Sequence, residues 1–228
     1  MSRLFPERVA VVLAPSEIAI GGKTLACDAA LGAEPWQGAV NALRAHEFKQ
    51  RCRVTVILSN HLVRYALVPW NEALSGAAEE EAYVRHHFRK IHGERAKDWS
   101  VRASEAPRSA PRLASAIDTK LLEELKLGFP KGGKAKLVSV QPRLMAEFNR
   151  HLAQIPASGA WLTLAEPGRA CVALHAANQW RAVQNAKGDW LPILERERVR
   201  LAGEVPDLVL LAGAQPPPEA AGWRFHQV

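Results

Sequence analysis

The stretch Val54–Trp70, VTVILSNHLVRYALVPW, decides the fold class that we expect for this chain. Its first part, Val54 to Leu58, is a continuous apolar run, the pattern of a strand that is covered on both faces. After a polar turn, a second strand is expected from Val63 to Val68, and Pro69 ends it. A strand buried on both faces needs layers packed on either side of its sheet, so we predict an α/β protein.

The segments before this stretch read as small strands followed by one helix. Two or three short antiparallel strands are expected, joined by tight turns at Pro15-Ser16 and Gly21-Gly22. The predicted strands are Arg8 to Ala14, Glu17 to Ile20 and Lys23 to Cys27, and the predicted helix runs from about Pro35 to Phe48.

The segments after it alternate helices and strands. Acidic residues open the helix expected over Glu79 to His92 and basic residues close it, which complements the helix dipole. Asp118 is a plausible N-cap for the next helix. The other expected elements are strands at Trp99 to Ala103, Leu113 to Ile117 and Lys136 to Val140, and helices at Lys120 to Leu127 and about Arg143 to Gln154.

The last third of the chain restarts the opening pattern. Its expected strands are Trp161 to Ala165, Ala170 to His175, Trp180 to Gln184, Leu208 to Leu211 and Trp223 to His226, with a helix from about Trp190 to Leu201. Residues 1–60 and 160–212 therefore both read strand, strand, strand, helix, strand, as in a ribonuclease-H-like unit. We predict two lobes, 1–157 and 158–228, the second of them shortened.

Composition narrows the class without giving a function. The chain has 228 residues and a net charge of +7. Its apolar fraction of 48% excludes a disordered chain. No apolar run reaches the ~18 residues of a membrane span. Lys and Arg are spread along the chain between Asp and Glu, so we interpret them as a solvated surface suited to an anionic membrane or an acidic partner. A basic nucleic-acid-binding module remains an alternative.

Three motifs invite a chemical interpretation, and each has a plainer one. Ile20 to Thr24, IGGKT, resembles the end of a phosphate-binding loop, but Glu17 stands where that loop needs a glycine, so a hairpin turn is expected. His86, His87 and His92 lack the spacing of zinc ligands and are expected on a solvated helix face. The segment 59–61, Ser-Asn-His, has no nucleophile elbow around its serine.

At this point the chain resembles type IV pilus assembly protein PilM, the MSHA-type pilus protein MshI and the cytoplasmic part of the type II secretion protein GspL. The likeness rests on Val54–Trp70, on Asp98-Trp99-Ser100-Val101, on Leu113–Asp118 and on Lys136–Pro142, in that order along the chain. The resemblance implies an actin-like ATPase fold in which a small α+β subdomain, about 62–118, is inserted into the first lobe.

In PilM the cleft between the lobes binds ATP through two Asp- and Gly-rich hairpins and a later Gly-Gly turn. The first hairpin here contains Pro15, Ser16 and Glu17, and proline has no N–H to offer a phosphate. The second contains Glu166 and Gly168 around another proline. We therefore expect no catalytic residue, metal or cofactor. The alternative is an ATP- and magnesium-dependent switch or ATPase in which Glu166 and Gly168 still serve phosphate.

The resemblance also implies a role and a partner. Such proteins are cytoplasmic scaffolds that lie at the inner membrane through a partner, hold the short cytoplasmic tail of a PilN-like bitopic protein and connect it to the assembly motor ATPase. In the family the tail docks beside the inserted subdomain. The residues expected to line that groove here are Arg64, Tyr65, Leu67 and Trp70.

Overall fold

The structure is a computed structural model, and it describes residues 6–28, 34–201, 203–218 and 222–228. Contacts divide these residues into two units, each built from two separate stretches of the chain. Unit 1 comprises the described residues of 1–63 and 117–146, and unit 2 those of 64–116 and 147–228. The predicted lobe boundary at residues 157 and 158 stays a prediction, because these units group contacting residues and do not delimit lobes.

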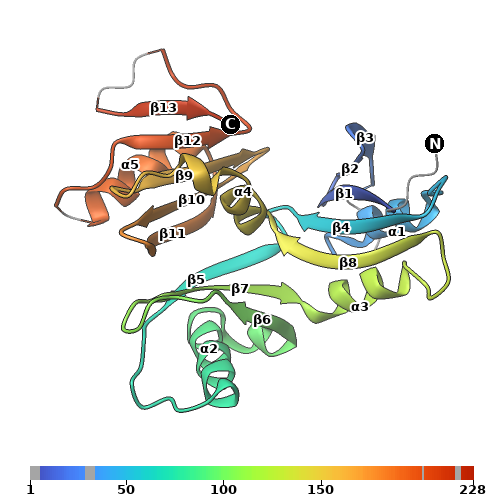
Figure 1. Ribbon diagram of the computed structural model, residues 1–228, viewed down its shortest axis with the longest axis horizontal. Coiled ribbons are helices and arrows are strands. Elements are labelled where there is room, and N and C mark those ends of the chain that lie inside the picture. The colour runs from blue at the N-terminus through green and yellow to red at the C-terminus, as the bar shows by residue number, and fades with distance from the viewer. Residues whose placement is uncertain (1–5, 29–33, 202, 219–221) are drawn as a thin grey trace. The chain divides into compact units, whose positions relative to one another are not determined.

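A five-stranded sheet organises unit 1. Its strands, in spatial order β3-β2-β1-β4-β8, are β3 (Lys23–Ala26), β2 (Glu17–Ile20), β1 (Glu7–Ala14), β4 (Cys52–Leu58) and β8 (Ala135–Pro142) (Figure 1). The first three pair antiparallel, whereas β4 and β8 run parallel to β1. The run that begins at Val54 therefore lies inside the sheet, and Val54, Val56 and Leu58 are fully buried.

Two helices accompany this sheet. α1 (Gln37–Ala45) packs on β1 and β2, and an ion pair between Arg44 and Glu124 joins it to α3 (Thr119–Leu127). The cap expected at Asp118 is confirmed, because the Lys120 N–H donates to its carboxylate at 2.8 Å. α1 is shorter than the predicted helix, since His46 adopts an extended backbone with ψ 119° and ends it before Phe48.

A smaller sheet and a helix open unit 2. The sheet has the order β5-β7-β6, with β5 (Val63–Val68), β7 (Arg112–Asp118) and β6 (Trp99–Ala103). α2 (Ala77–His92) lies against it, followed by a 3-10 segment (Gly93–Asp98). Phe88 and Val84 of α2 pack with Ala66 and Val68 of β5 and with Val101 of β6. This satellite core fixes α2 against the small sheet, closest to β6.

The second five-stranded sheet repeats the strand order of the first. Its order is β11-β10-β9-β12-β13, and the bounds are β9 (Ala160–Glu166), β10 (Arg169–Ala176), β11 (Gln179–Lys187), β12 (Leu208–Ala212) and β13 (Arg224–Gln227). Again three strands pair antiparallel and two run parallel to the first of them. The internal repeat expected from the sequence is thus confirmed as topology.

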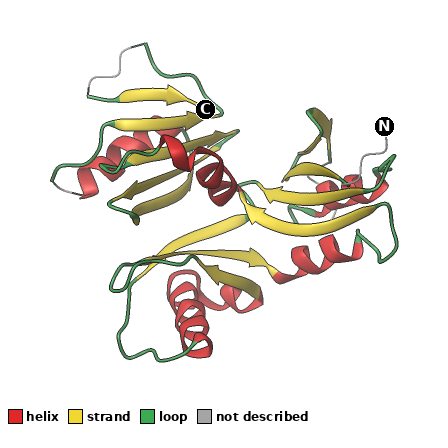
Figure 2. Cartoon of the chain, viewed as in Figure 1, coloured by secondary structure: helices red, strands yellow, loops and turns green. Residues whose placement is uncertain are grey.

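Helices complete unit 2 (Figure 2). α5 (Trp190–Leu201) covers one face of the second large sheet, where Ile193 and Leu194 meet Val172 and Trp161. α4 (Arg143–His151) continues into a 3-10 segment (Leu152–Gln154), and its Phe148 packs on Trp180 with ring centroids 4.6 Å apart. Among the described residues, no helix is both long and apolar enough to cross a membrane.

Candidate functional site

The main candidate site is a pocket of about 590 Å³ in unit 2 that two strands at sheet edges line together. β5 is the first strand of the three-stranded sheet, and β11 is the first of the second large sheet. We call it the edge-strand pocket. Its lining comes from β5 (Arg64, Tyr65, Ala66 and Leu67), α2 (His87, Ile91 and His92), β11 (Arg181, Val183, Gln184 and Asn185) and α5 (Arg200 and Leu201).

The two strands that line the pocket are end members of their sheets among the described residues. β5 pairs with β7, and β11 pairs with β10. An end strand is the place where an extended segment of another chain can be added to a sheet. The pocket therefore combines a lining of side chains with two edge strands.

The lining is rich in cationic side chains. It includes Arg64, Arg181 and Arg200, but neither Asp nor Glu. Arg200 is compensated by buried Glu197, whose carboxylate lies 2.6 Å from its guanidinium. Burial lowers the pKa of Arg64, and the charge of nearby Arg169 lowers it further. Arg64 is half-buried and Arg181 is exposed, and with no acidic side chain in the lining the pocket favours anionic groups.

Two histidines of α2 add a polar wall to the pocket. Burial lowers the pKa of both, and the charges of Lys90 for His87 and of Arg64 for His92 act in the same direction. His92 differs from the solvated position expected for it, because it stacks on Phe88 and meets the edge of Trp99 at 5.1 Å between centroids. The sequence did not point to His87, His92 or Arg181 as site residues, because it does not show that α2 and β11 line the same pocket.

The structure divides the four partner-binding residues expected from the sequence. Arg64, Tyr65 and Leu67 line the edge-strand pocket. Trp70 follows β5 and borders a separate small pocket of about 40 Å³, together with Tyr83 of α2. Its side chain is 36% exposed. Three of the four residues thus belong to one site, and Trp70 belongs to a neighbouring surface.

The two hairpins for which the sequence resemblance implied phosphate contacts are tight two-residue turns. In unit 1, Pro15 and Ser16 connect β1 to β2, and Ala14 pairs with Glu17 across the turn. In unit 2, Pro167 and Gly168 connect β9 to β10, and Gly168 has φ 70°, as the third residue of a type II turn requires. Both turns place proline, which has no N–H, at the tip.

Gly213 has a packing role at the end of the second large sheet. It follows β12 with φ 81°, and a Cβ at this position would lie 2.2 Å from the Ala165 carbonyl oxygen. Only glycine lets the backbone approach the end of β9 so closely. The sequence alone could not distinguish this role from contact with a ligand.

The remaining motifs from the sequence have plain structural roles. Gly21 and Gly22, with φ 56° and 81°, form the hairpin turn between β2 and β3, so the hairpin interpretation is confirmed. Ser59 is fully buried, and its hydroxyl accepts a hydrogen bond from the His61 N–H at 3.2 Å. Within the described ranges, no group of three or more His, Cys, Asp or Glu residues could hold a metal ion.

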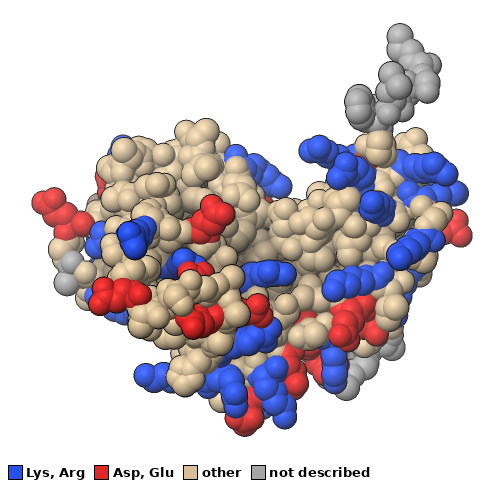
Figure 3. Space-filling view, turned by 60° about the horizontal axis from the view of Figure 1, so that its bottom comes forward, with Lys and Arg blue, Asp and Glu red and all other residues tan. Residues whose placement is uncertain are grey.

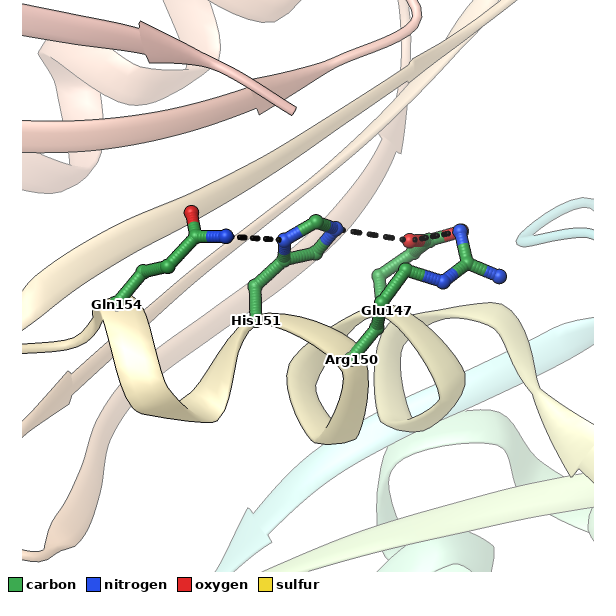
Figure 4. A network of polar contacts seen from close by, with 4 residues as sticks. All are labelled: Glu147, Arg150, His151 and Gln154. Carbon is green, nitrogen blue, oxygen red and sulfur yellow. Dashed lines mark hydrogen bonds and ion pairs between the residues drawn. The ribbon is translucent and has the colours of Figure 1, made fainter.

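A polar network on α4 was missed from sequence (Figure 4). Glu147 is nearly buried and lies 2.9 Å from Arg150 and 3.5 Å from His151. Gln154 completes the row, 3.2 Å from the other ring nitrogen of His151. The spacing i, i+3, i+4, i+7 puts all four on one helix face. These contacts join members of the row to one another, so the network orders this helix face.

The surface carries both signs of charge. On the face shown in Figure 3, Lys and Arg outweigh Asp and Glu, and acidic side chains lie among them over much of that face. This agrees with the interpretation of most of the +7 charge as a solvated surface.

No protein-family model and no curated protein matches the chain. Solved structures do match. One is a Bacteroides thetaiotaomicron protein with an actin-like ATPase fold and unknown function, with a TM-score of 0.57, 12% identity, and coverage of 91% of this chain and 82% of that chain. Another is the cytoplasmic domain of EpsL, an inner-membrane component of the type II secretion system of Vibrio cholerae. Its TM-score is 0.57 and its identity 15%, and the match covers 97% of this chain and 89% of that chain.

A third match is the PilM–PilN type IV pilus biogenesis complex, with a TM-score of 0.58, 14% identity, and coverage of 90% of this chain and 81% of that chain. At these identities the likeness establishes the fold. The two sheets of equal strand order and the third small sheet agree with it. The chain therefore has the actin-like ATPase fold that the sequence resemblance implied.

Proposed function

We propose that this chain is a non-catalytic scaffold of a type IV pilus or type II secretion-like assembly platform, and that it binds the cytoplasmic tail of a bitopic inner-membrane protein. The observation that carries the proposal is the edge-strand pocket, in which Arg64, Tyr65 and Leu67 of β5 line one cavity together with the edge strand β11. The fold likeness to the EpsL cytoplasmic domain and to the PilM–PilN complex supports this class of role.

The pocket suggests how the tail is held. An extended tail lies along the edge strands β5 and β11, and its alternate side chains enter the pocket. Tyr65 and Leu67 offer apolar contact, and Arg64 and Arg181 offer charge to carboxylates. The tail segment that binds is therefore extended and carries at least one acidic residue. Held there, the tail of a membrane protein keeps the scaffold at the inner membrane, where it connects to the assembly motor.

The same proposal includes the loss of nucleotide binding. Pro15 and Pro167 occupy the tips of the turns that would present N–H groups to phosphate. The glycine at position 213 is required by the close approach of the backbone to the end of β9, so it needs no phosphate contact to account for it. We expect no binding of ATP with magnesium in the micromolar range by calorimetry, and binding in that range would support the switch or ATPase alternative.

The tail-binding proposal is tested with a labelled peptide covering the cytoplasmic tail of a PilN-like bitopic protein. Fluorescence anisotropy with Arg64→Gln and with Leu67→Ala should show about tenfold weaker binding, the size expected for residues near the centre of an interface. Trp70→Ala should weaken binding less, because Trp70 lies at a neighbouring pocket.

Matched control variants separate the pocket from general surface effects. Arg95→Gln removes an exposed cation and Leu25→Ala an exposed leucine, and neither residue lines the pocket. Both should bind the peptide as the wild type does. Equal losses in pocket and control variants, with unchanged circular dichroism, would contradict the proposed site.

A further inference from the structure

A row of cations crosses the sheet of unit 1. The parallel register pairs Arg8 of β1 with Arg53 of β4, and Arg53 with Lys136 of β8. Residues in register on neighbouring strands point to the same face, so the three charges lie side by side. All three side chains are exposed, whereas Val54, whose side chain points to the opposite face, is fully buried.

Such a row has an energetic cost. Like charges directly opposite each other on neighbouring strands destabilise a sheet. An acidic neighbour would relieve the cost, but in the described parts of the chain none of the three makes an ion pair, and Glu7 beside Arg8 alternates to the other face. The row therefore lowers the stability of the sheet and, in return, concentrates positive charge on one face of it.

A second group of cations joins the row at Lys136. A hollow of about 420 Å³ lies between the end of α3 and the start of β8, and Lys126, Lys131 and Lys136 line it with Phe129. Residues 125–140 contain four lysines and no acidic residue. Row and hollow share Lys136, and we call their cations together the basic surface: Arg8, Arg53, Lys126, Lys131 and Lys136.

Exposed apolar side chains border the basic surface. Leu127 is 69% exposed and Val138 is 38% exposed, and each is a sequence neighbour of a lysine-bearing stretch. A pattern of cations with interspersed apolar groups suits the headgroup region of an anionic bilayer, where charges meet lipid phosphates and apolar side chains reach the acyl boundary.

We propose that the basic surface is a docking surface for anionic phospholipid headgroups. Its residues all belong to unit 1, whereas those that line the edge-strand pocket belong to unit 2. Nucleic acid is a less suitable ligand, because Phe129, the one aromatic residue among the described residues that line the hollow, is partly buried and packs at a tilt against Phe48. The surface would lay the scaffold directly on the membrane, independently of any bound tail.

Vesicle co-sedimentation of the full chain tests the proposal without any partner protein. The wild type should bind phosphatidylcholine vesicles that contain phosphatidylglycerol and should not bind phosphatidylcholine alone. Each cation near an anionic surface contributes a factor of about five, so the combined variant Arg53→Gln, Lys131→Gln and Lys136→Gln should bind about 100-fold more weakly. Binding should fall as salt is raised, because screening shortens the reach of the charges to ~3 Å at 1 M.

The control variant carries the same change in net charge elsewhere. Lys90→Gln, Arg95→Gln and Lys97→Gln together remove three exposed cations of unit 2. This variant should retain most of the vesicle binding. Equal losses in both triple variants would mean that net charge alone is responsible and would overturn the docking surface, as would a wild type that ignores anionic vesicles.

A third arm addresses nucleic acid. If the wild type binds a single-stranded oligonucleotide more tightly than anionic vesicles at the same ionic strength, and the Arg53, Lys131 and Lys136 substitutions abolish that binding, the proposal is overturned in favour of nucleic acid. Melting curves show that each variant is folded. Failure of vesicle binding leaves the peptide experiment of the proposed function unaffected, because that experiment contains no lipid.

Discussion

The two large sheets share one strand order but differ in how their faces are covered. In the second sheet, Ala160–Leu164 and Ala170–Leu174 are buried at every residue, so both faces of β9 and β10 are covered. In the first, only Val11 and Leu13 of β1 are buried and the residues between and before them are partly or fully exposed, and β3 is exposed at all four residues. The same topology therefore serves a closed core in one case and an open, charged face in the other.

The difference shows which property sets topology and which sets surface. Strand order follows from the succession of apolar runs and turns, which both halves share. The charge of an open face is set by the alternate residues of each strand, as with Arg53 beside buried Val54. A sheet can hence change its partner without changing its fold.

The largest loss of stability is expected from a substitution at the centre of the second large sheet. Trp161 is fully buried on β9, and its indole N–H donates to the Pro206 carbonyl at 3.0 Å. Trp161→Ala leaves a large cavity and an unpaired carbonyl, so we expect a loss of about 3–5 kcal/mol in the free energy of unfolding. Chemical denaturation measures it. Trp70→Ala is the control, because its side chain is 36% exposed and should cost about 1 kcal/mol or less.

A smaller loss of stability is expected from a substitution where the end of β12 approaches the end of β9. Gly213→Ala combines a positive φ with a clash against the Ala165 carbonyl, and we expect a loss of about 3 kcal/mol. Gly22→Ala has the same φ of 81° but meets no atom within 4 Å, so it should lose about 1 kcal/mol. Equal losses would show that the close approach to β9 is not rigid.

Acid should weaken unit 2 through three histidines. Burial lowers the pKa of His87, of His92 and of His175. Their unfolded forms take up protons below about pH 6.5 while the folded forms stay neutral. The stability that depends on them is thus complete above that pH and is lost as pH falls toward the folded values.

The melting temperature should therefore fall between pH 7 and 5.5 by a few degrees, roughly 2–4 °C for each kcal/mol. His175→Phe keeps a ring against Phe148 and Trp180 but cannot titrate, so its melting temperature should depend less steeply on pH. A melting temperature that rises on acidification, or an unchanged slope in this variant, would contradict the buried neutral state of His175.

The smallest expected effect has the opposite sign. Arg53 stands between Arg8 and Lys136, so Arg53→Thr relieves two like-charge contacts and adds a β-branched residue. We expect a gain of about 0.5 kcal/mol in the free energy of unfolding. Lys97→Thr, which removes a cation outside any strand, is the control and should give no gain. A loss of stability in Arg53→Thr would mean that the row is not repulsive.

Much of the fold could be predicted because it depends on local patterns. β5 and β6 have the predicted bounds, and the Asp118 cap and the Gly21-Gly22 turn were predicted from single side chains and glycines. α1 was predicted too long, because the extended backbone of His46 has no sequence signal. Fold class and internal repeat needed only the order of apolar runs, and the likeness to solved structures agrees with both.

The sites depend on relations that no local pattern contains. Arg64 and Leu67 could be named from their strand, but Arg181 and Arg200, more than a hundred residues later, enter the same pocket only through the folding of unit 2. Likewise, Arg8, Arg53 and Lys136 form a row only in one register of three strands. A slip of one residue would send one of these charges to the other face.

The discontinuous make-up of unit 1 has a consequence for synthesis. β4 ends at Leu58, but its neighbour β8 ends only at Pro142, so 142 − 58 = 84 residues must be translated before the first sheet is complete. At about 5–20 residues per second this takes roughly 4–17 s. During that interval the nascent β4 has an open, apolar edge while the residues of the small sheet and α2 leave the ribosome. Folding of this chain therefore includes a waiting period in which this apolar strand needs protection, by a chaperone or by prompt folding of the inserted segment.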